Sequence, residues 1–301
     1  MSEQIRIRTD LALEARNSVS EDATVIKGIK VVEERDAEND ITIIRMDVLN
    51  KNGANKIGKP VGAYITMEVP NMADEDDGYH REISKSLATQ IKSLIVDSYN
   101  WDERIPKILI AGLGNSDSTP DSLGPLVLSN LMITRHIVEY LGYTEIEGAF
   151  AVTSGITPGV MAQTGMESSE IIQAIIKKTK PDVLLVVDAL AARSVSRLNT
   201  TIQISDTGIH PGSGVGNTRA AINRKTMGIP VISIGVPTVV DAATLVYDSL
   251  KRAKNDMPVG FAQDFEQMYV TPKDIDAIVK RLSYTISEGI NICMGLSKCQ
   301  E

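Results

Sequence analysis

The chain has 301 residues, of which 43% are hydrophobic and only 4% aromatic, so it can bury a large core built mainly from aliphatic side chains. Its formal net charge of −8 argues against direct binding of nucleic acid, which requires neutralisation of phosphate groups. Two cysteines are too few for a disulfide framework, and neither a secretory signal nor a run of about 18 apolar residues occurs, so we expect a cytoplasmic protein with no membrane partner.

The first hundred residues predict a short helix, three strands and a longer helix. The short helix covers Leu11–Asn17. Three β-rich runs follow at Gly28–Glu33, Ile41–Leu49 and Val61–Val69, separated by clusters of Asp, Asn, Gly and Lys that are typical of turns. Helical periodicity then extends over Ile83–Tyr99.

From Pro106 onward, predicted strands and helices alternate, which is typical of βαβ units. In chain order these are strand Lys107–Ala111, helix Ser122–Leu141, the apolar run Gly148–Thr153, helix Ser168–Lys178, strand Val183–Val187, the run Thr201–Ile204, strand Val231–Gly235, helix Asp241–Lys254 and helix Pro272–Met294. We therefore predict an α/β fold with a mostly parallel twisted sheet flanked by helices. Within a single domain, residues 11–105 form a β-rich N-terminal elaboration and residues 106–301 form the α/β core.

Two aspartates stand out because each follows an apolar run that is typical of a buried strand. Asp188 comes directly after Val183–Val187, and Asp121 comes ten residues after Lys107–Ala111. Ligands collect beyond the carboxyl ends of the strands in a parallel α/β sheet, so the two carboxylates could meet in one crevice. Such a pair can share a proton and activate a water molecule. We predict that Asp121 and Asp188 are catalytic.

Each aspartate also has a purely structural interpretation. Thr119-Pro120-Asp121 is a typical helix start, with Thr as N-cap, Pro at the first helical position and an acid in the first turn. Asp188 could form an ion pair with Arg193 or cap a turn. The sequence pattern leaves both interpretations open.

A glycine turn, Gly112-Leu113-Gly114-Asn115, follows the first of these strands and suggests a dinucleotide fingerprint. That fingerprint needs a third glycine where this chain has Asp117, and the acids would repel a pyrophosphate. We therefore expect no cofactor. The backbone N–H groups of Gly112, Gly114 and Asn115 are instead candidates for stabilising an oxyanion.

The three histidines provide few alternatives, because none belongs to an HExxH motif and no GxSxG motif occurs. His210 lies in the glycine-rich segment Ile209–Asn217. It could complete a metal site with Asp121 and Asp188, although our first expectation is a site without metal.

Several motifs together resemble those of the germination proteases of spore-forming bacteria, endopeptidases that degrade small acid-soluble spore proteins. The motifs are Ile7–Ala15, Gly112–Asn115 with Thr119–Pro125, Ala151–Glu167, Asp188–Arg193 and Ile209–Asn217. The resemblance implies a hydrolase of the EC 3.4 class in the forespore or spore core that uses two aspartates, here Asp121 and Asp188, and no metal. It also implies a fold similar to that of the hydrogenase-maturation endopeptidases, in which acids at the equivalent strand ends bind nickel.

The same resemblance implies a homotetrameric precursor that loses a short N-terminal propeptide. Substrates of the family are cut after an acid in a sequence of the type Thr-Glu-Ile/Phe-Ala-Ser-Glu. The segment Thr9–Glu14 repeats the order Thr, acid, apolar, Ala, any residue, Glu. We therefore predict self-cleavage between Asp10 and Leu11, which makes residues 1–10 a propeptide and residues 11–301 the peptidase domain.

Two other functions remain open at this point. One is a metal-dependent endopeptidase of the maturation type that uses Asp121, Asp188 and His210. The other is a non-catalytic binding module on the same fold. If a carboxylate pair operates instead, and if the precursor must protonate a carboxylate in order to rearrange, self-processing should accelerate as the pH falls.

Overall fold

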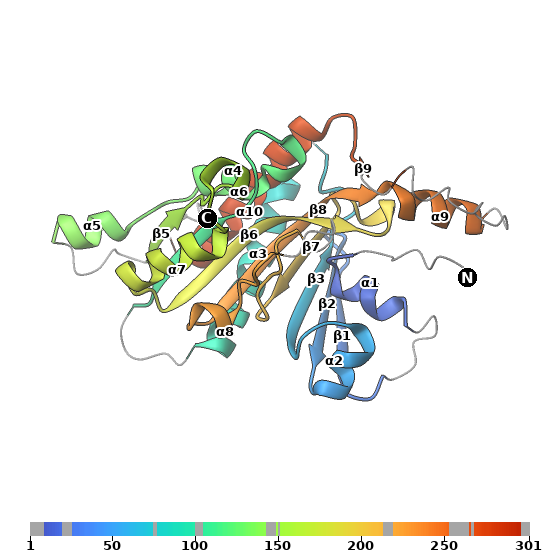
Figure 1. Cartoon of the computed structure of the whole chain (residues 1–301), viewed down its shortest axis with the longest axis horizontal. Coiled ribbons are helices and arrows are strands. Elements are labelled where there is room, and N and C mark those ends of the chain that lie inside the picture. The colour runs from blue at the N-terminus through green and yellow to red at the C-terminus, as the bar shows by residue number, and fades with distance from the viewer. Residues whose placement is uncertain are drawn as a thin grey trace.

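A computed structural model describes residues 9–19, 26–74, 77–99, 105–142, 149, 151–212, 219–252, 265 and 268–295 (Figure 1). In this part of the chain, nine strands form one sheet in the order β1-β2-β3-β7-β8-β6-β4-β5, with β9 paired to β8. None of the described helices is both long and apolar enough to cross a membrane. Cys299, the first eight residues and residues 213–217 of the glycine-rich segment lie outside the described residues.

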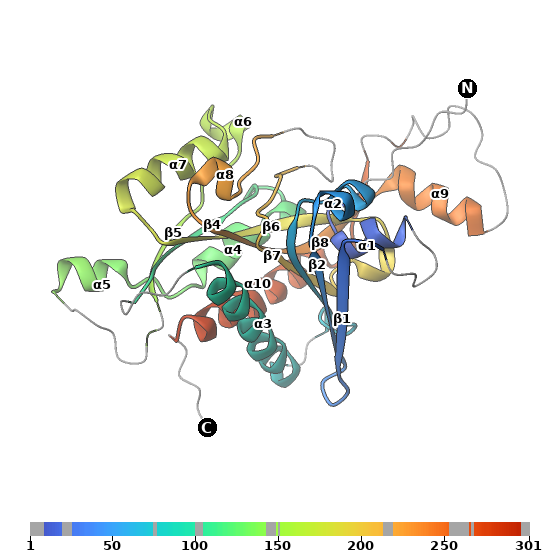
Figure 2. The same ribbon diagram turned by 90° about the horizontal axis from the view of Figure 1, so that it is seen from below.

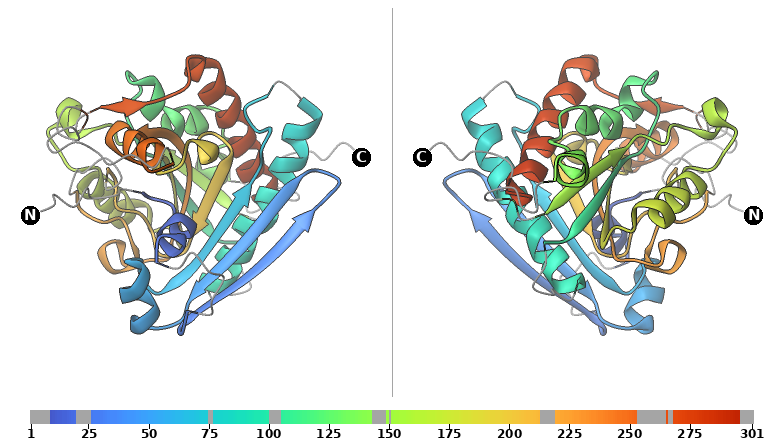
Figure 3. Two further views of the ribbon diagram at one scale, coloured as in Figure 1. Left: turned by 90° about the vertical axis from the view of Figure 1, so that its right-hand side faces the viewer. Right: turned by 90° about the vertical axis from the view of Figure 1, so that its left-hand side faces the viewer.

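The N-terminal part contains the predicted strands and helices. Its elements are α1 (Ala12–Asn17), β1 (Ile29–Asp36), β2 (Ile41–Val48), α2 (Lys51–Ile57), β3 (Gly62–Glu68) and α3 (Asp77–Ser98). Strands β1 and β3 each run antiparallel to β2, which lies between them, and β3 pairs with β7 of the C-terminal part. Figure 3 shows the hairpin of β1 and β2, in blue, at the edge of the sheet beside the teal helix α3. The β-rich elaboration is therefore continuous with the central sheet.

Helix α2 falls in a stretch whose composition is typical of a turn. Asn50 caps it, because its side chain accepts hydrogen bonds from the N–H groups of Asn52 and Gly53. Gly58 ends it in the left-handed conformation at φ 66°. The helix buries Ile57 in a small core. Asn and Gly residues within α2 have low helix propensity, so the caps and the packing of Ile57 stabilise this helix.

The C-terminal part alternates strands and helices. Its elements are β4 (Lys107–Gly112), the 3₁₀ turn η1 (Thr119–Asp121), α4 (Leu123–Ser129), α5 (Arg135–Tyr140), β5 (Val152–Ile156), α6 (Met161–Thr164), α7 (Ser168–Thr179), β6 (Val183–Ala192), the 3₁₀ turn η2 (Val195–Arg197), β7 (Thr201–Ser205), α8 (Arg224–Met227), β8 (Val231–Asp241), α9 (Ala242–Arg252), β9 (Tyr269–Val270) and α10 (Ile275–Cys293). The predicted run Gly148–Thr153 begins outside the described residues, and β5 starts within its end.

The sheet is mixed, so the prediction of a mostly parallel sheet is wrong. Strand pairs β4–β5, β4–β6 and β6–β8 are parallel, whereas β7 is antiparallel to both of its neighbours, β3 and β8. Only residues 193–200 connect β6 to β7, and parallel strands need a crossover of a dozen or more residues. Strand β7 therefore returns in the opposite direction and joins the antiparallel N-terminal strands.

The predicted helix Ser122–Leu141 is two helices, α4 and α5. The chain between them is drawn toward the sheet and α10, because Thr134 pairs with Thr153 of β5 through backbone and hydroxyl groups. The N–H of Met132 also donates to Asn291 of α10 at 3.0 Å. These tertiary contacts override the helical pattern of the sequence.

Helices cover both faces of the sheet (Figure 2). On one face, α3, α4 and α10 share one apolar core with the odd-numbered side chains Val183, Leu185 and Val187 of β6. On the other face, Ile172 and Ile176 of α7 pack against the even-numbered Leu184 and Val186. The alternation of apolar residues to both faces explains why the sequence of β6 is a continuous hydrophobic run.

Candidate active site

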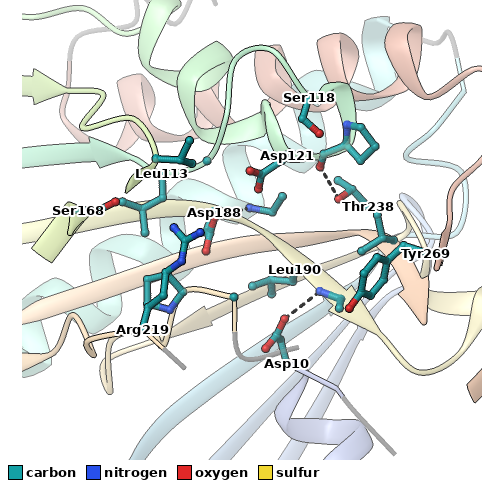
Figure 4. A pocket seen from close by; sticks show the side chains of 18 residues that line it. Asp10, Leu113, Ser118, Asp121, Ser168, Asp188, Leu190, Arg219, Thr238 and Tyr269 are labelled. Carbon is teal, nitrogen blue, oxygen red and sulfur yellow. Dashed lines mark hydrogen bonds between the residues drawn. The ribbon is translucent and has the colours of Figure 1, made fainter. Parts of the chain in front are cut away.

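A cavity of about 350 Å³ opens where β4 ends and β6 continues. Residues from several parts of the chain line it, among them Asp10; Leu113, Gly114, Ser118, Pro120 and Asp121 after β4; Asp188–Ala191 of β6; Arg219; and Thr238 and Val239 of β8. Figure 4 shows the Asp121 and Asp188 carboxylates directed into this pocket beside Arg219, with Leu190 between Asp188 and Asp10. The structure therefore brings the two predicted catalytic residues together.

Asp188 lies inside a strand rather than beyond its end. Strands β6 and β8 both continue past their predicted ends, at Val187 and Gly235, and Asp188 pairs with Gly235 in the parallel register. The neighbouring strand β4 stops at Gly112, opposite Val187, which opens the pocket at Asp188. The crevice thus lies at the carboxyl end of β4, as expected for an α/β sheet. Asp188 is only 6% exposed, and its Oδ1 accepts the N–H of Ala189 at 3.0 Å.

Asp121 ends the short turn η1 and is held by the glycine turn that follows β4. The N–H of Asn115 donates to the Asp121 carboxylate at 2.9 Å and to its carbonyl at 3.1 Å. Gly114 has φ 112°, and a Cβ there would lie 2.0 Å from the Asp121 carbonyl oxygen, so the turn requires glycine. The helix-start pattern is real, but Ser118 rather than Thr119 is the N-cap residue.

Helix α4 approaches the end of β4 very closely, which fixes Asp121 relative to Asp188. A Cβ at Gly124 would lie 2.2 Å from the carbonyl oxygen of Leu113, and one at Gly112 would lie 2.2 Å from that of Gly124. The Leu113 N–H in turn donates to the Val187 carbonyl at 2.8 Å, one residue before Asp188. Because Gly112 and Gly124 have no side chains, α4 can pack closely against the end of β4, and this packing sets the position of Asp121 relative to Asp188.

Both acids are disfavoured in their ionised forms. Burial raises the pKa of Asp121, although the hydrogen bond from Asn115 and the charge of Arg219 oppose the change. Burial raises the pKa of Asp188 well above its usual range, and the negative charges of Asp121 and Asp10 add to the effect. Two nearby carboxyls with separated pKa values can hold one proton between them.

Arg219 is a pocket residue that no sequence motif marked. It lines the cavity and favours the ionised forms of both aspartates. Its position just after the glycine-rich segment was the one signal in the sequence, because such segments often border sites.

Other expectations for the site differ from the geometry. Of the three N–H groups predicted to stabilise an oxyanion, that of Asn115 is already bound to Asp121, so the glycine turn orients Asp121. The role of the Gly112 and Gly114 N–H groups stays a prediction. Arg193 pairs with Asp248 at 3.0 Å instead of with Asp188.

His210 is not brought together with the aspartates. It lines a separate pocket, and among the described residues no three His, Cys, Asp or Glu side chains lie close enough to hold a metal ion. The proposed metal set of Asp121, Asp188 and His210 is therefore not assembled.

The predicted cleavage segment lies against the same strand. The N–H of Asp10 donates to the Ala191 carbonyl at 3.0 Å, and the Asp10 carboxylate accepts the Ala191 N–H at 2.9 Å. Leu11 is fully buried against Leu190, Ala192 and Val240. The Asp10 side chain thus enters the pocket of the two aspartates while Leu11 fills an apolar site beside it.

The carbonyl of Asp10, which belongs to the predicted scissile bond, is also bound. It accepts hydrogen bonds from Lys59 Nζ at 2.8 Å and from Gln203 Nε2 at 3.2 Å. Burial lowers the pKa of Lys59, and the acids Asp10 and Glu14 oppose that change. No sequence pattern marked Lys59 or Gln203, because both come from elements that are remote in sequence from Asp10.

Comparison with known proteins gives consistent matches. A family model described as germination protease matches residues 7–255. The germination protease of Clostridium tetani is 40% identical over 96% of this chain and 95% of that protein. That of Bacillus thuringiensis subsp. konkukian is 36% identical over 96% and 93%, respectively. Among solved structures, the NiFe hydrogenase maturation protease HycI from Thermococcus kodakarensis KOD1 matches with a TM-score of 0.33 and 16% identity, over 67% of this chain and 99% of that chain.

Proposed function

The chain belongs to the germination protease family of peptidases, and we propose that it is an endopeptidase that initiates the degradation of small acid-soluble spore proteins during spore germination. The resemblance carried by the sequence motifs is thus confirmed at the level of the family. The observation that supports the proposal most strongly is the pocket that holds Asp121, Asp188 and Asp10 together. The net charge of −8 favours substrate that has been released from DNA over substrate still bound to it.

In the proposed mechanism, the two aspartates share one proton and activate a water molecule. Asp188 holds the proton, since burial and two neighbouring acids raise its pKa well above the usual range. Asp121 is the base, since the Asn115 N–H and Arg219 favour its ionised form. Asp121 takes a proton from water as the water attacks the scissile carbonyl, and Asp188 donates its proton to the carbonyl oxygen. The intermediate then collapses: Asp121 gives its proton to the leaving amine nitrogen as the C–N bond breaks, and Asp188 takes a proton back from a hydroxyl of the new carboxyl group.

We further propose that the chain is made as a precursor that cleaves itself between Asp10 and Leu11, releasing residues 1–10. In support, Asp10 lies in the pocket and Leu11 occupies an apolar site next to it. Asp10 is bound at Ala191, which is about 10 Å along β6 from Asp188 at the usual rise of a strand. The bond must therefore move toward the dyad before it is cut, which is a physical reason for an inactive precursor. We expect this precursor to be a homotetramer in the spore core.

Cleavage assays with single variants test the dyad. We expect Asp121→Asn and Asp188→Asn each to slow self-processing and the cleavage of a DNA-free spore protein by on the order of 10³-fold. Mass spectrometry of the mature wild-type chain should find Leu11 at its N-terminus. Near-normal activity of both folded variants would refute the dyad. Activity that a chelator removes and a divalent metal restores would favour the metal-dependent alternative.

A further inference from the structure

Side chains bind both polar groups of the Asp10–Leu11 bond. The Asp10 carbonyl accepts hydrogen bonds from Lys59 Nζ at 2.8 Å and from Gln203 Nε2 at 3.2 Å, so both lone pairs of its oxygen are used. The Leu11 N–H donates to the Thr9 hydroxyl at 3.1 Å. We call Lys59 and Gln203, the two donors to the carbonyl, the latch.

The latch is attached to fixed parts of the fold. Gln203 lies in β7, where it pairs with Gly235 of β8, and its Oε1 also accepts the Ala12 N–H at 2.6 Å. Lys59 directly follows Gly58, the residue that ends α2, and its side chain lines a small pocket together with Gln203. Since the sheet and α2 fix both donors, the latch binds the segment at one position.

The contact of Asp10 with β6, in contrast, can be made at a second position. Strand β4 stops opposite Val187, and beyond it the edge of β6 lines the cavity of the two aspartates as far as Ala191. The carbonyls of Val187 and Ala191 both accept hydrogen bonds on this edge, so that of Ala189, midway between them, faces it too. A shift of the Asp10 N–H from the Ala191 carbonyl to that of Ala189 keeps an equivalent hydrogen bond. It moves the predicted scissile bond about 7 Å toward the dyad.

We propose that Lys59 and Gln203 are positioning residues of self-cleavage, which hold the predicted scissile bond at Ala191 until their release lets it move along β6 to the dyad. The proposal rests on the proposed function, because it takes Asp10–Leu11 as the cut bond and the two aspartates as the dyad. The latch contacts exist in the starting state and are broken before the bond is cut, so they raise the barrier to self-cleavage. Removing a latch residue should therefore accelerate the reaction, whereas removing a group that activates the carbonyl would slow it.

The rate at which purified precursor converts to the mature chain tests the latch. In Lys59→Met the side chain keeps a similar length but cannot donate, so we expect conversion at about pH 6 to be about tenfold faster than in the wild type. Gln203→Met removes a neutral donor and should accelerate conversion about threefold. Gel densitometry over time measures the rates, and circular dichroism confirms that each precursor is folded. A folded Lys59→Met precursor that converts at the wild-type rate or more slowly would overturn the proposal.

The matched control is Lys56→Met. It removes an equal charge from an exposed position in the last turn of α2, shortly before Lys59. We expect this variant to convert at the wild-type rate. If Lys56→Met and Lys59→Met were equally fast, the acceleration would come from the loss of positive charge near the groove, and the latch would be refuted.

Hydrogen exchange measures release of the segment in a precursor that cannot convert. In an Asp188→Asn background, adding Lys59→Met should accelerate exchange of the Asp10 and Ala12 N–H groups by a factor similar to the gain in conversion rate. Unchanged exchange of these groups would overturn the latch. Failure of the proposed function is distinguishable, since it would appear as conversion of this double variant or as a cut at another bond, identified by mass spectrometry.

Discussion

Asp188 is stabilising in its neutral form and costly in its ionised form. Its side chain is 6% exposed, accepts one N–H from Ala189 and lies near the negative charges of Asp121 and Asp10. In the unfolded chain the same carboxyl titrates near its ordinary value. Folding therefore binds this proton more tightly, and the native state loses stability as the pH rises through the raised pKa. The proposed mechanism requires an ionisable acid at position 188, and this requirement lowers the stability of the native state at neutral pH.

This opposition predicts that Asp188→Asn is inactive but more stable than the wild type at neutral pH. The amide has nearly the same shape and cannot ionise, so it avoids the cost of a buried charge. We expect its Tm to exceed that of the wild type by about 2 °C or more near pH 8, with the difference shrinking toward about pH 5. Thermal unfolding followed by circular dichroism at both pH values measures this. A variant Tm at or below that of the wild type at both pH values would contradict the sign of the pKa shift.

At the scale of elements, the best-predicted features were those with local signals. The periodic helix α10 and the apolar strand β4 were expected at nearly their observed positions. Helix α3 begins six residues before its predicted start, and β8 continues six residues past its predicted end. The extension of β6 through Asp188 was missed, because Ala and Leu after an acid carry no strand signal of their own. What holds this extension is its parallel pairing with β8 as far as Ala192 and Val240.

The candidate site was only partly predictable for the same reason. Asp121 and Asp188 follow apolar strands, and the Thr9–Glu14 segment resembles a substrate, so the sequence alone marked them. Arg219, Lys59 and the donors that bind Glu14 come from elements that are brought together only by the folded sheet. Glu14 is bound by the backbone N–H groups of Arg193 and Ser194, and a backbone contact cannot be recognised from the type of residue that makes it.

The close approach of α4 to β4 predicts that a single methyl group at Gly124 disturbs the dyad. The added Cβ would lie 2.2 Å and 2.5 Å from the Leu113 backbone and 2.7 Å from the Val187 carbonyl oxygen, and none of these atoms belongs to a flexible side chain. Gly124→Ala should therefore displace α4 and Asp121. We expect kcat to fall by about tenfold or more and stability by about 1–3 kcal/mol.

A second glycine separates the loss of geometry from the loss of stability. Gly228, at the end of α8, has φ 77°, and a methyl group added there would meet no atom within 4 Å, so Gly228→Ala strains the backbone without touching the dyad. It should lose a comparable amount of stability in chemical denaturation and retain full kcat. If Gly124→Ala and Gly228→Ala lost activity equally, the prediction that Gly124 sets the position of Asp121 would be refuted.

At the scale of the whole molecule, the mixed sheet brings the precursor segment and the dyad into one groove. The N-terminal part supplies Asp10 and Lys59, β7 supplies Gln203, and the parallel core supplies Asp188. The substrate-like segment is therefore held by both halves of the chain. The groove needs the antiparallel strands as much as the parallel ones, which gives the N-terminal part a functional reason to share the sheet.

Three carboxylates meet in this groove, so its charge should control self-processing. Asp188 takes up a proton as the pH falls through its raised pKa, which removes its repulsion of Asp10 and creates the singly protonated dyad. We expect the rate of conversion to the mature chain to rise several-fold between about pH 8 and about pH 6, and Asp188→Asn to show no conversion at either pH. Gel densitometry and mass spectrometry of the precursor over time measure the rate, with circular dichroism confirming that the chain stays folded. A rate that is flat across this interval would show that protonation of the groove does not limit the rearrangement.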